Sequence, residues 1–425
     1  MKAAKKVLCA ALILTVVAGA VFAGGEAEGS AAGGDAVIRF MTWEGETMNQ
    51  AMLATFTNAI PGVKVELEPT PLQDYGVKLQ EMLAANIAPD VFMVGNDMAL
   101  NYWAEGLTAD LTPYLQNDQE FLKGFYPGTL TTYTVGGKYV ATPGLINLYG
   151  FFYNKKYFDD AGIPYPTKDW TYADMFAVAE KLKDPANNRY GIYAKTNDVF
   201  FSAIYSASKD GTSFCDVIYP VKKVQASPAF LEGITLTTQA IKSKAITDPL
   251  YDATNVNGMF MQGAIPVLFY GQWAADELIR NAPATLKWGY VPNPRVNRTA
   301  QILDAVGWAV NKKTKNLDAA FKVLKYIHTN TYGEVLSKTP VAPPAYQPAA
   351  QGYYNTLRNA GHQDMAEALD YILNAEIKLP IRFLDTWGAR ANRFLEADWN
   401  YFLTGERPVS DIQKAIVDPI NGVIR

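Results

Sequence analysis

The chain is poor in the residues that cross-link a protein or bind transition metals. Its 425 residues include two cysteines, Cys9 and Cys215, and two histidines, His328 and His362. Cys9 lies in a segment that we expect to be removed, so the mature chain would keep one cysteine and could form no internal disulfide. Because no Cys-x-x-Cys motif occurs, we predict no metal site and no cofactor. The fold must then be stabilised by burial of apolar side chains.

The chain also lacks an excess of positive charge. It has 38 Lys and Arg against 42 Asp and Glu, and removing the three lysines of residues 1–23 gives a charge of 35 − 42 = −7. This balance excludes the basic footprint of a nucleic-acid-binding protein and argues against anionic ligands. With 49% hydrophobic residues, 19% charged residues and a mean hydropathy of −0.06, the composition excludes a polytopic membrane protein.

Common catalytic motifs are missing as well. Neither Gly-x-Ser-x-Gly nor His-Glu-x-x-His occurs, and no carboxylate stands in a recognisable acid/base context. We therefore predict a protein that is not an enzyme and has no catalytic residue. A secreted glycoside hydrolase stays open as an alternative, because Glu44 and Asp97 could pair across a cleft.

The first residues predict export. Three lysines precede an apolar run over 7–20, and a small-residue cleavage pattern follows at 21–23, which together indicate an export signal over residues 1–23. Residues 24–36 hold Gly, Ala, Ser and Glu without a large apolar side chain, so we expect a flexible tether there. The protein would then be periplasmic, and it would stay anchored if the signal were not cleaved.

Aromatic residues, by contrast, are abundant, at 12% of the chain. The most concentrated stretch is 139–155, where Pro143-Gly144 leads into an apolar and aromatic run from Leu145 to Tyr153. Such a run predicts a strand buried on both faces, and it is too short to cross a membrane. Its one polar residue, Asn147, either bonds a neighbouring backbone group or faces a ligand where the strand crosses between two lobes.

The region before this strand alternates between strand and helix patterns. Strands are predicted over 37–43, 63–68 and 91–94, with helical spacing over 48–56 and 72–85. This βαβαβ order predicts a mostly parallel sheet, in which ligands collect outside the carboxyl ends of the strands. Two loops qualify, 43–46 and 95–97.

A third candidate loop follows a later strand. Residues 265–270 read as a strand that ends at Gly271-Gln272-Trp273, directly before the acidic helix start at Asp276. This order places Trp273 where an open sheet binds its ligand. The alternative is a Trp packed between helix and sheet. Further crossings between lobes are predicted at 303–311 and at the proline-rich 340–348.

Four blocks of the sequence together resemble a known family. Residues 139–155, 158–171, 259–273 and 307–316 are similar to the carbohydrate-binding proteins of ABC importers, the family-1 extracellular solute-binding proteins, in the same order and behind an export signal. The resemblance covers essentially all of 37–425.

The resemblance implies an α/β, two-lobed periplasmic-binding-protein fold of type II, with a mostly parallel sheet flanked by helices in each lobe. The N-terminal lobe would comprise 37–144 plus 304–340, and the C-terminal lobe 145–303 plus 341–425. A neutral sugar would bind in the cleft between the lobes, the hinge would close on it, and the closed monomer would dock on a membrane permease.

The resemblance also suggests the ligand-binding residues. At the first crossing strand several relatives carry an acidic residue where this chain has Asn147, so the identity of the ligand does not transfer by analogy. Flat rings for a sugar face and planar polar groups for its hydroxyls would come from Trp43, Glu44, Asn96, Asp97, Asn147, Gly271, Gln272, Trp273, Asp304, Trp308, Arg382 and Trp387.

Other cargoes remain open on the same fold. An amino acid, a polyamine or a polyol phosphate could replace the sugar. A phosphate would require several converging cations or a free helix N-terminus, and only Arg382 and Arg390 are candidates.

Overall fold

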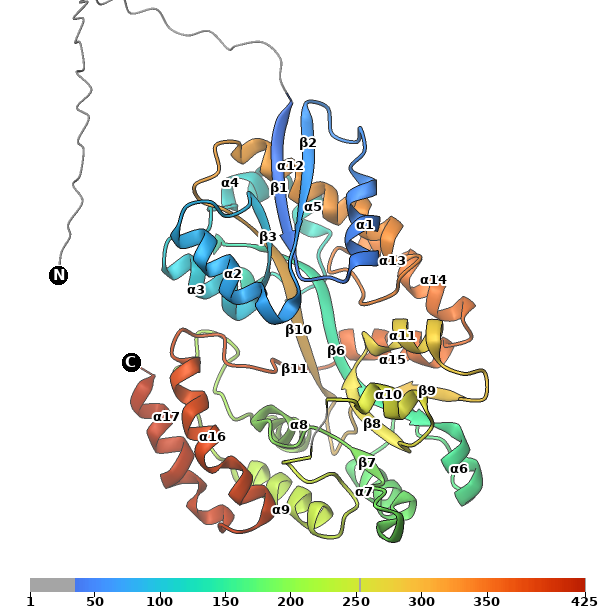
Figure 1. Ribbon diagram of the computed structural model, residues 1–425. Coiled ribbons are helices and arrows are strands. Elements are labelled where there is room, and N and C mark those ends of the chain that lie inside the picture. Colours follow the sequence, from blue (N-terminus) through green and yellow to red (C-terminus); the bar gives the residue numbers. More distant parts are fainter. Residues whose placement is uncertain (1–34, 252–253, 425) are drawn as a thin grey trace, which may run out of the picture. The chain divides into compact units, whose positions relative to one another are not determined.

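The computed structural model describes residues 35–251 and 254–424 (Figure 1). The predicted export signal and nearly all of the predicted tether lie outside the described residues. The first strand begins at Ala36, one residue before the predicted start. Within the described ranges, no helix combines the length and the apolar character needed to cross a membrane.

The strands form one mixed sheet and one small hairpin. The sheet runs in the order β2-β1-β3-β10-β6-β8-β7, with β11 beside β10 and β9 beside β6, while β4 and β5 pair with each other. The strands are β1 (Ala36–Thr42), β2 (Val63–Pro69), β3 (Val91–Gly95), β4 (Thr134–Val135), β5 (Lys138–Tyr139), β6 (Thr142–Asn154), β7 (Ile192–Tyr193), β8 (Val267–Gly271), β9 (Trp288–Val291), β10 (Ala300–Val310) and β11 (Ile377–Leu379).

The described helices surround this sheet. They are α1 (Glu46–Thr55), α2 (Leu72–Ala84), α3 (Asn96–Ala104), α4 (Thr112–Asn117), α5 (Gln119–Lys123), α6 (Lys155–Ala161), α7 (Tyr172–Leu182), α8 (Val199–Asp210), α9 (Pro228–Lys242), α10 (Val256–Met261), α11 (Ala274–Asn281), α12 (Leu317–Tyr326), α13 (Tyr332–Leu336), α14 (Gln351–Asn359), α15 (Gln363–Leu373), α16 (Gly388–Thr404) and α17 (Asp418–Val423).

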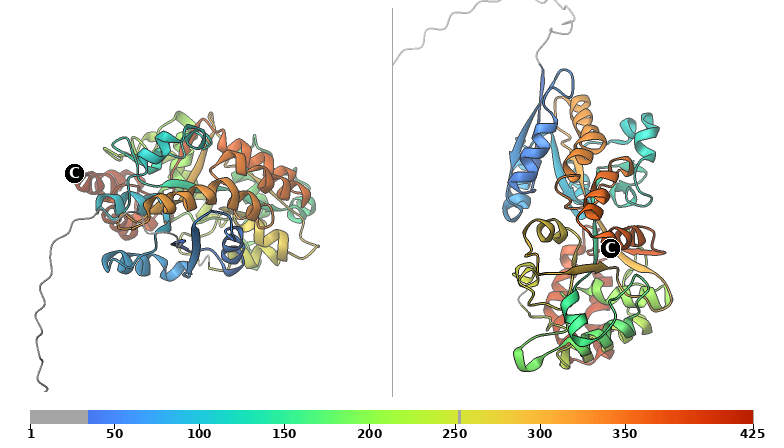
Figure 2. Two further views of the ribbon diagram at one scale, coloured as in Figure 1. Left: turned by 90° about the horizontal axis from the view of Figure 1, so that it is seen from above. Right: turned by 90° about the vertical axis from the view of Figure 1, so that its right-hand side faces the viewer.

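The predicted βαβαβ start is confirmed within two residues at each boundary, from β1 to β3. β1 pairs in parallel with both β2 and β3, as right-handed crossover connections require. The helices α12 and α13 pack against β1 and α1, as the orange and blue segments in the right-hand view of Figure 2 show. The α/β fold class is confirmed.

The two long strands β6 and β10 correspond to two of the three predicted crossings, and the third, at 340–348, forms no strand. They lie side by side in antiparallel register through the middle of the sheet (Figure 1). One end of this pair meets β3, and the other meets β8. The pairs β6–β10, β3–β10 and β6–β8 are antiparallel, because β6 and β10 run in opposite directions along the sheet. The pairs β1–β3 and β7–β8, further from the middle, are parallel.

Apolar burial is divided between two clusters of side chains. One includes Phe40, Val91 and Trp308, and the other includes Phe158, Phe230 and Trp399. The strand β6 contributes to both, since Ile146 belongs to the first cluster and Phe151 to the second. The first cluster also includes Leu268 and Tyr290, so it continues along β6 beyond the middle of the sheet.

Helix starts follow local sequence signals. A capping box opens α7, because the Thr171 hydroxyl accepts the Asp174 N–H at 3.1 Å and the Asp174 carboxylate accepts the Thr171 N–H at 2.8 Å. The polar and aromatic stretch after Asp198 forms the buried helix α8.

Candidate functional site

A cavity of about 810 Å³ lies at the ends of β6, β7, β8 and β10. Three of the predicted ligand-binding residues line it: Asp97, Trp273 and Arg382. Its other lining residues include members of β6, β8, the loop between β7 and α8, and residues 248, 249, 251, 254 and 256. We call it the aromatic cavity, because Tyr149, Phe201, Phe269, Tyr270 and other rings face it.

The indole of Trp273 is held by neighbouring rings. Tyr149 meets it edge-on, with ring centroids 5.2 Å apart at 87°, and Tyr270 lies 5.5 Å away. A Cβ on Gly271 would lie 1.9 Å from the Trp273 ring, so only glycine at that position lets the indole lie across the end of β8. The strand–Gly–x–Trp pattern therefore places Trp273 in the cavity wall, and its predicted contact with a ligand stays a prediction.

Gln272 does not have the ligand-binding role that was predicted for it. It is fully buried, its Oε1 accepts the Leu148 N–H at 2.6 Å, and its Nε2 donates to the Ile146 carbonyl at 3.1 Å. These bonds tie the segment that carries Trp273 to the crossing strand β6. Both ends of the amide are occupied, and the side chain does not line the cavity.

A polar cluster around Arg382 contributes to the same cavity. Nη2 of Arg382 donates to Oδ2 of Asp304 at 2.9 Å, and Nη1 donates to Oδ1 of Asp97 at 3.4 Å. The amide of Asn96 donates to the other oxygen of Asp304 at 2.8 Å. Burial raises the pKa of Asp304, an effect that Arg382 and Asn96 oppose. The pKa of Arg382 is raised, chiefly by the Asp304 charge.

The sheet register explains how these distant residues meet. In the parallel pair of β10 and β11, Ile302 lies opposite Leu379, so Asp304 and Arg382 follow side by side. In the antiparallel pair of β10 and β3, Val306 lies opposite Gly95, which brings Asp97 toward Asp304. Arg382 thus contacts Asp304, 78 positions before it in the sequence, and Asp97, 285 positions before it.

Asn147 lies next to this cluster on the crossing strand. It is opposite Asp304 in the register of β6 and β10, and it is half-buried. Among the described residues its side-chain amide has no hydrogen-bond partner, and it does not line the aromatic cavity. Its predicted contact with a ligand therefore stays a prediction.

Trp43 and Glu44 lie at the carboxyl end of β1, as predicted, but outside the lining of the aromatic cavity. Trp43 packs edge-on against Tyr75, with centroids 4.9 Å apart at 88°. The Glu44 backbone is fixed at both ends, since its N–H donates to the Thr42 hydroxyl and its carbonyl accepts from Asn49. Burial raises the pKa of the Glu44 carboxyl to about 7.

We expect this buried carboxyl to make stability depend on pH. The Glu44 carboxyl ionises near 4.5 in an unfolded chain and near 7 here. As pH rises through this window the folded state keeps a proton that the unfolded chain has lost, so its stability falls; below the window the penalty is absent. We predict that the free energy of unfolding of Glu44→Gln falls by about 1–2 kcal/mol less than that of the wild type as pH rises through this window. This figure allows for the water around a half-buried group.

The measurement is urea unfolding of both proteins at pH 4, 5.5, 7 and 8. Glu46→Gln is the matched control, because Glu46 is an exposed glutamate two residues further on. A Glu44→Gln curve that parallels the wild type from pH 4 to pH 8 contradicts the prediction.

Two predicted tryptophans belong to the core and need correction. Trp308 is fully buried, packs against Phe40 and donates its indole N–H to the Tyr332 hydroxyl at 2.6 Å. Trp387 is 6% exposed and packs on Phe383. Neither ring has a face open to the aromatic cavity, so the predicted stacking role of both is not supported.

Asp198 is a cavity residue that the sequence reasoning missed. It is the N-cap of α8, and its Oδ1 accepts the Phe200 N–H at 2.9 Å. Burial raises its pKa to about 6. Its loop follows the carboxyl end of β7, the same position as the predicted loops. However, β7 has only two residues, too few for an alternating pattern.

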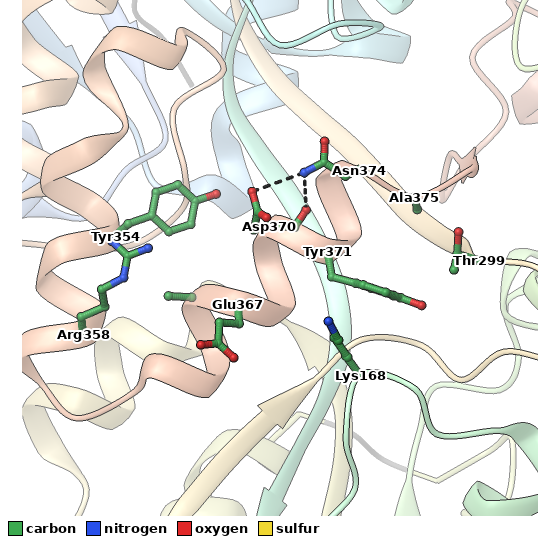
Figure 3. Close-up of a pocket in the computed structure, with 10 residues that line it drawn as sticks. Lys168, Thr299, Tyr354, Arg358, Glu367, Asp370, Tyr371, Asn374 and Ala375 are labelled. Atoms are coloured by element: carbon green, nitrogen blue, oxygen red, sulfur yellow. Dashed lines mark hydrogen bonds between the residues drawn. The ribbon is translucent and has the colours of Figure 1, made fainter.

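A second hollow, of about 520 Å³, lies beside α14 and α15 (Figure 3). Lys168 and Arg358 stand there with Glu367 and Asp370, and the Asn374 amide donates to the Asp370 carbonyl and carboxylate. None of the predicted ligand-binding residues lines it. The aromatic cavity is therefore the better candidate site.

The crossing strands, the two cores and the aromatic cavity define a two-lobed binding protein. The model of the bacterial extracellular solute-binding protein family matches residues 42–334. The chain belongs to this family, the family-1 extracellular solute-binding proteins of ABC transporters. The members and structural neighbours compared are binding proteins rather than enzymes.

Individual relatives are more distant. A maltotriose-binding protein of Pyrococcus abyssi is 25% identical over 296 residues, which cover 66% of this chain and 59% of that protein. A binding protein of Brucella abortus is 25% identical over 284 residues, 63% of this chain and 65% of that protein. The chain thus spans less than two thirds of the length of either relative.

Solved structures show the same fold at lower identity. The ABC substrate-binding protein Lmo0181 of Listeria monocytogenes, in complex with cycloalternan, matches with a TM-score of 0.75 and 23% identity, covering 92% of this chain and 98% of that one. The sugar-binding protein MalE of Xanthomonas citri matches with a TM-score of 0.74 and 17% identity, covering 91% and 97%.

Proposed function

We propose that this protein is the substrate-binding component of an ABC importer and captures a neutral mono- or oligosaccharide in the aromatic cavity. The lobes, 37–144 plus 304–340 and 145–303 plus 341–425, close around the ligand by bending of the crossing strands. The closed protein, an exported periplasmic monomer, then delivers the sugar to membrane permease subunits.

The observation that carries this proposal is the pairing of an indole face with a polar rim in one cavity. Trp273, whose ring lies across Gly271, lines the same cavity as Arg382 and Asp97, which contact each other. A sugar offers apolar C–H faces and a fringe of hydroxyls, each both a donor and an acceptor, so rings and charged planar groups suit it.

The names of related proteins support the same class of ligand. The Pyrococcus relative is named for maltotriose, the Listeria structure holds cycloalternan, and the GacH receptor of Streptomyces glaucescens was solved with acarbose. A few charge-assisted bonds and one stacked ring would give roughly 8 kcal/mol, which corresponds to a micromolar dissociation constant.

A phosphorylated cargo fits less well. The guanidinium of Arg382 already faces Asp304 and Asp97, so it offers an incoming phosphate little uncompensated charge. A phosphate site needs several converging cations or an open helix N-terminus.

The experiment is a thermal-shift screen of the purified protein against mono- and oligosaccharides, amino acids, polyamines and polyol phosphates. A ligand present at 100 times its dissociation constant adds about 2.7 kcal/mol to the free energy of unfolding. We expect one or more neutral sugars to raise the melting temperature. We also expect the bound sugar to be recovered chemically unchanged after the measurement. A rise with spermidine, an amino acid or a sugar phosphate alone contradicts the proposal, and so does hydrolysis of the bound sugar.

A further inference from the structure

Negative charge predominates around the aromatic cavity. Asp97, Asp198 and Asp248 line it, and the cations among its described lining residues are Lys195 and Arg382. Lys195 is exposed, and exposed charges are screened by salt far more than buried ones. The charge of the cavity therefore depends mainly on whether Arg382 is free to act as a cation.

Arg382 is not free. Its guanidinium contacts the Asp304 carboxylate at 2.9 Å and the Asp97 carboxylate at 3.4 Å. The Asp304 side chain is 1% exposed and the Arg382 side chain 37% exposed, so water screens that pair less than a pair on the surface. One guanidinium between two carboxylates leaves this group with a charge of −1.

Asp198 adds a second negative charge to the lining of the same cavity. Only its Oδ1 is used by the protein, as the N-cap of α8. Within the described part of the chain, its Oδ2 makes no hydrogen bond. Because the carboxylate lines the cavity, that oxygen is available to a hydroxyl or ammonium donor of a ligand.

Aromatic rings in the cavity lining favour the same ligands as the carboxylates. Trp273, Tyr149 and Phe269 line the cavity beside Asp198. The face of an aromatic ring is negative, so it attracts a cation and repels an anion. This second feature is independent of the acidic residues, and it belongs to the same cavity wall.

We infer that the aromatic cavity selects its ligand by charge: it admits neutral sugars and sugars that carry an amine, and it excludes uronic acids and sugar phosphates, with Asp198 as a specificity-determining residue. The sugar part of this inference rests on the proposed function. The charge part does not, and it can be tested without knowing the ligand.

The test uses charged quenchers of tryptophan fluorescence at pH 8 and low ionic strength. Caesium, iodide and neutral acrylamide are titrated into the wild type and Trp273→Phe, and the difference isolates the emission of Trp273. Surface potentials in clefts reach several kT. The measured quantity is the ratio of the caesium to the iodide quenching constant of Trp273, divided by the same ratio for free tryptophan amide. We expect this normalised ratio to be at least about three and to fall toward one in 0.5 M salt.

Two variants assign the effect to Asp198. Asp198→Asn keeps an oxygen for the N-cap but removes the charge, and we expect it to lower the caesium-to-iodide ratio by about half. Asp210→Asn is the matched control, because Asp210 accepts the N–H two residues ahead at 2.9 Å, as Asp198 does, and lies outside the cavity lining. Equal quenching by both ions, no quenching of Trp273 by acrylamide, or identical results for the two variants overturns the inference.

Binding of glucosamine and glucuronate then separates the two proposals. If glucuronate or a sugar phosphate binds as tightly as its neutral counterpart, the charge selection is wrong while the proposed sugar capture stands. If no carbohydrate binds but the caesium contrast depends on Asp198, the proposed function fails and the charge selection stands.

Discussion

Replacing Trp273 by alanine is expected to weaken ligand binding about thirty-fold, a loss of about 2 kcal/mol, as for a buried aromatic anchor at an interface. The reason is that Trp273 offers its ring to the cavity while Tyr149 and Tyr270 hold it in place. Titration calorimetry with the sugar that gives the largest thermal shift measures the effect.

Two further variants make this test specific. In Gly271→Ala the added Cβ would lie 1.9 Å from the indole, so the ring must move and affinity should fall in the same direction. Trp103→Ala is the control, because Trp103 is half-buried on α3 and outside the cavity lining. A change of less than threefold in Trp273→Ala would refute the placement of the binding site.

Replacing Arg382 by methionine is expected to lower the free energy of unfolding by about 2–3 kcal/mol, less than the usual cost of breaking a fully buried ion pair, because the Arg382 side chain is 37% exposed. The Asp304 carboxylate, 1% exposed, would keep the Asn96 amide and the Ala305 backbone N–H but no cation in contact. Its pKa is already raised by burial, and loss of the guanidinium raises the pKa further. Because a protonated carboxyl carries no charge to bury, the deficit should shrink as pH falls.

Urea unfolding of matched variants tests this account. Arg298→Met removes an exposed pair with Glu376, whose side chains are 46% and 50% exposed, and should cost about 0–1 kcal/mol. Combining Arg382→Met with Asp304→Asn removes the unpaired charge and should recover most of the loss. An Arg382→Met protein as stable as Arg298→Met contradicts a stabilising role for the cluster.

The elements that sequence reasoning located best are those with a local signature. The residue patterns of the strands and helices from β1 to β3 alternate clearly. The capping box of α7 involves only the four residues from Thr171 to Asp174. Trp273 was located by a strand, a glycine and a helix start in succession. In each case the physical cause, hydrophobic period or backbone geometry, acts over a few neighbouring residues.

The misplaced residues depend on pairing between distant strands. Trp308 and Trp273 are the same residue type, each near the end of a strand pattern. Trp308 lies opposite Met93 and Thr142 in the middle of the sheet, and this pairing buries it. A residue's neighbours across the sheet, and not its neighbours in the chain, decide whether its ring is core or cavity wall.

By itself, then, the sequence determined an α/β chain with long crossing strands, no excess of positive charge and a tryptophan at the end of β8, because these depend on composition and short-range pattern. The tertiary structure alone decided that Arg382 contacts both Asp97 and Asp304. It also decided that the Gln272 side chain bonds the backbone of β6, and that Asp198 lines the aromatic cavity. Those contacts follow from the registers of β10 with β3 and β11 and from the junction of β6 with β8, and register is set by how whole strands bury their faces together.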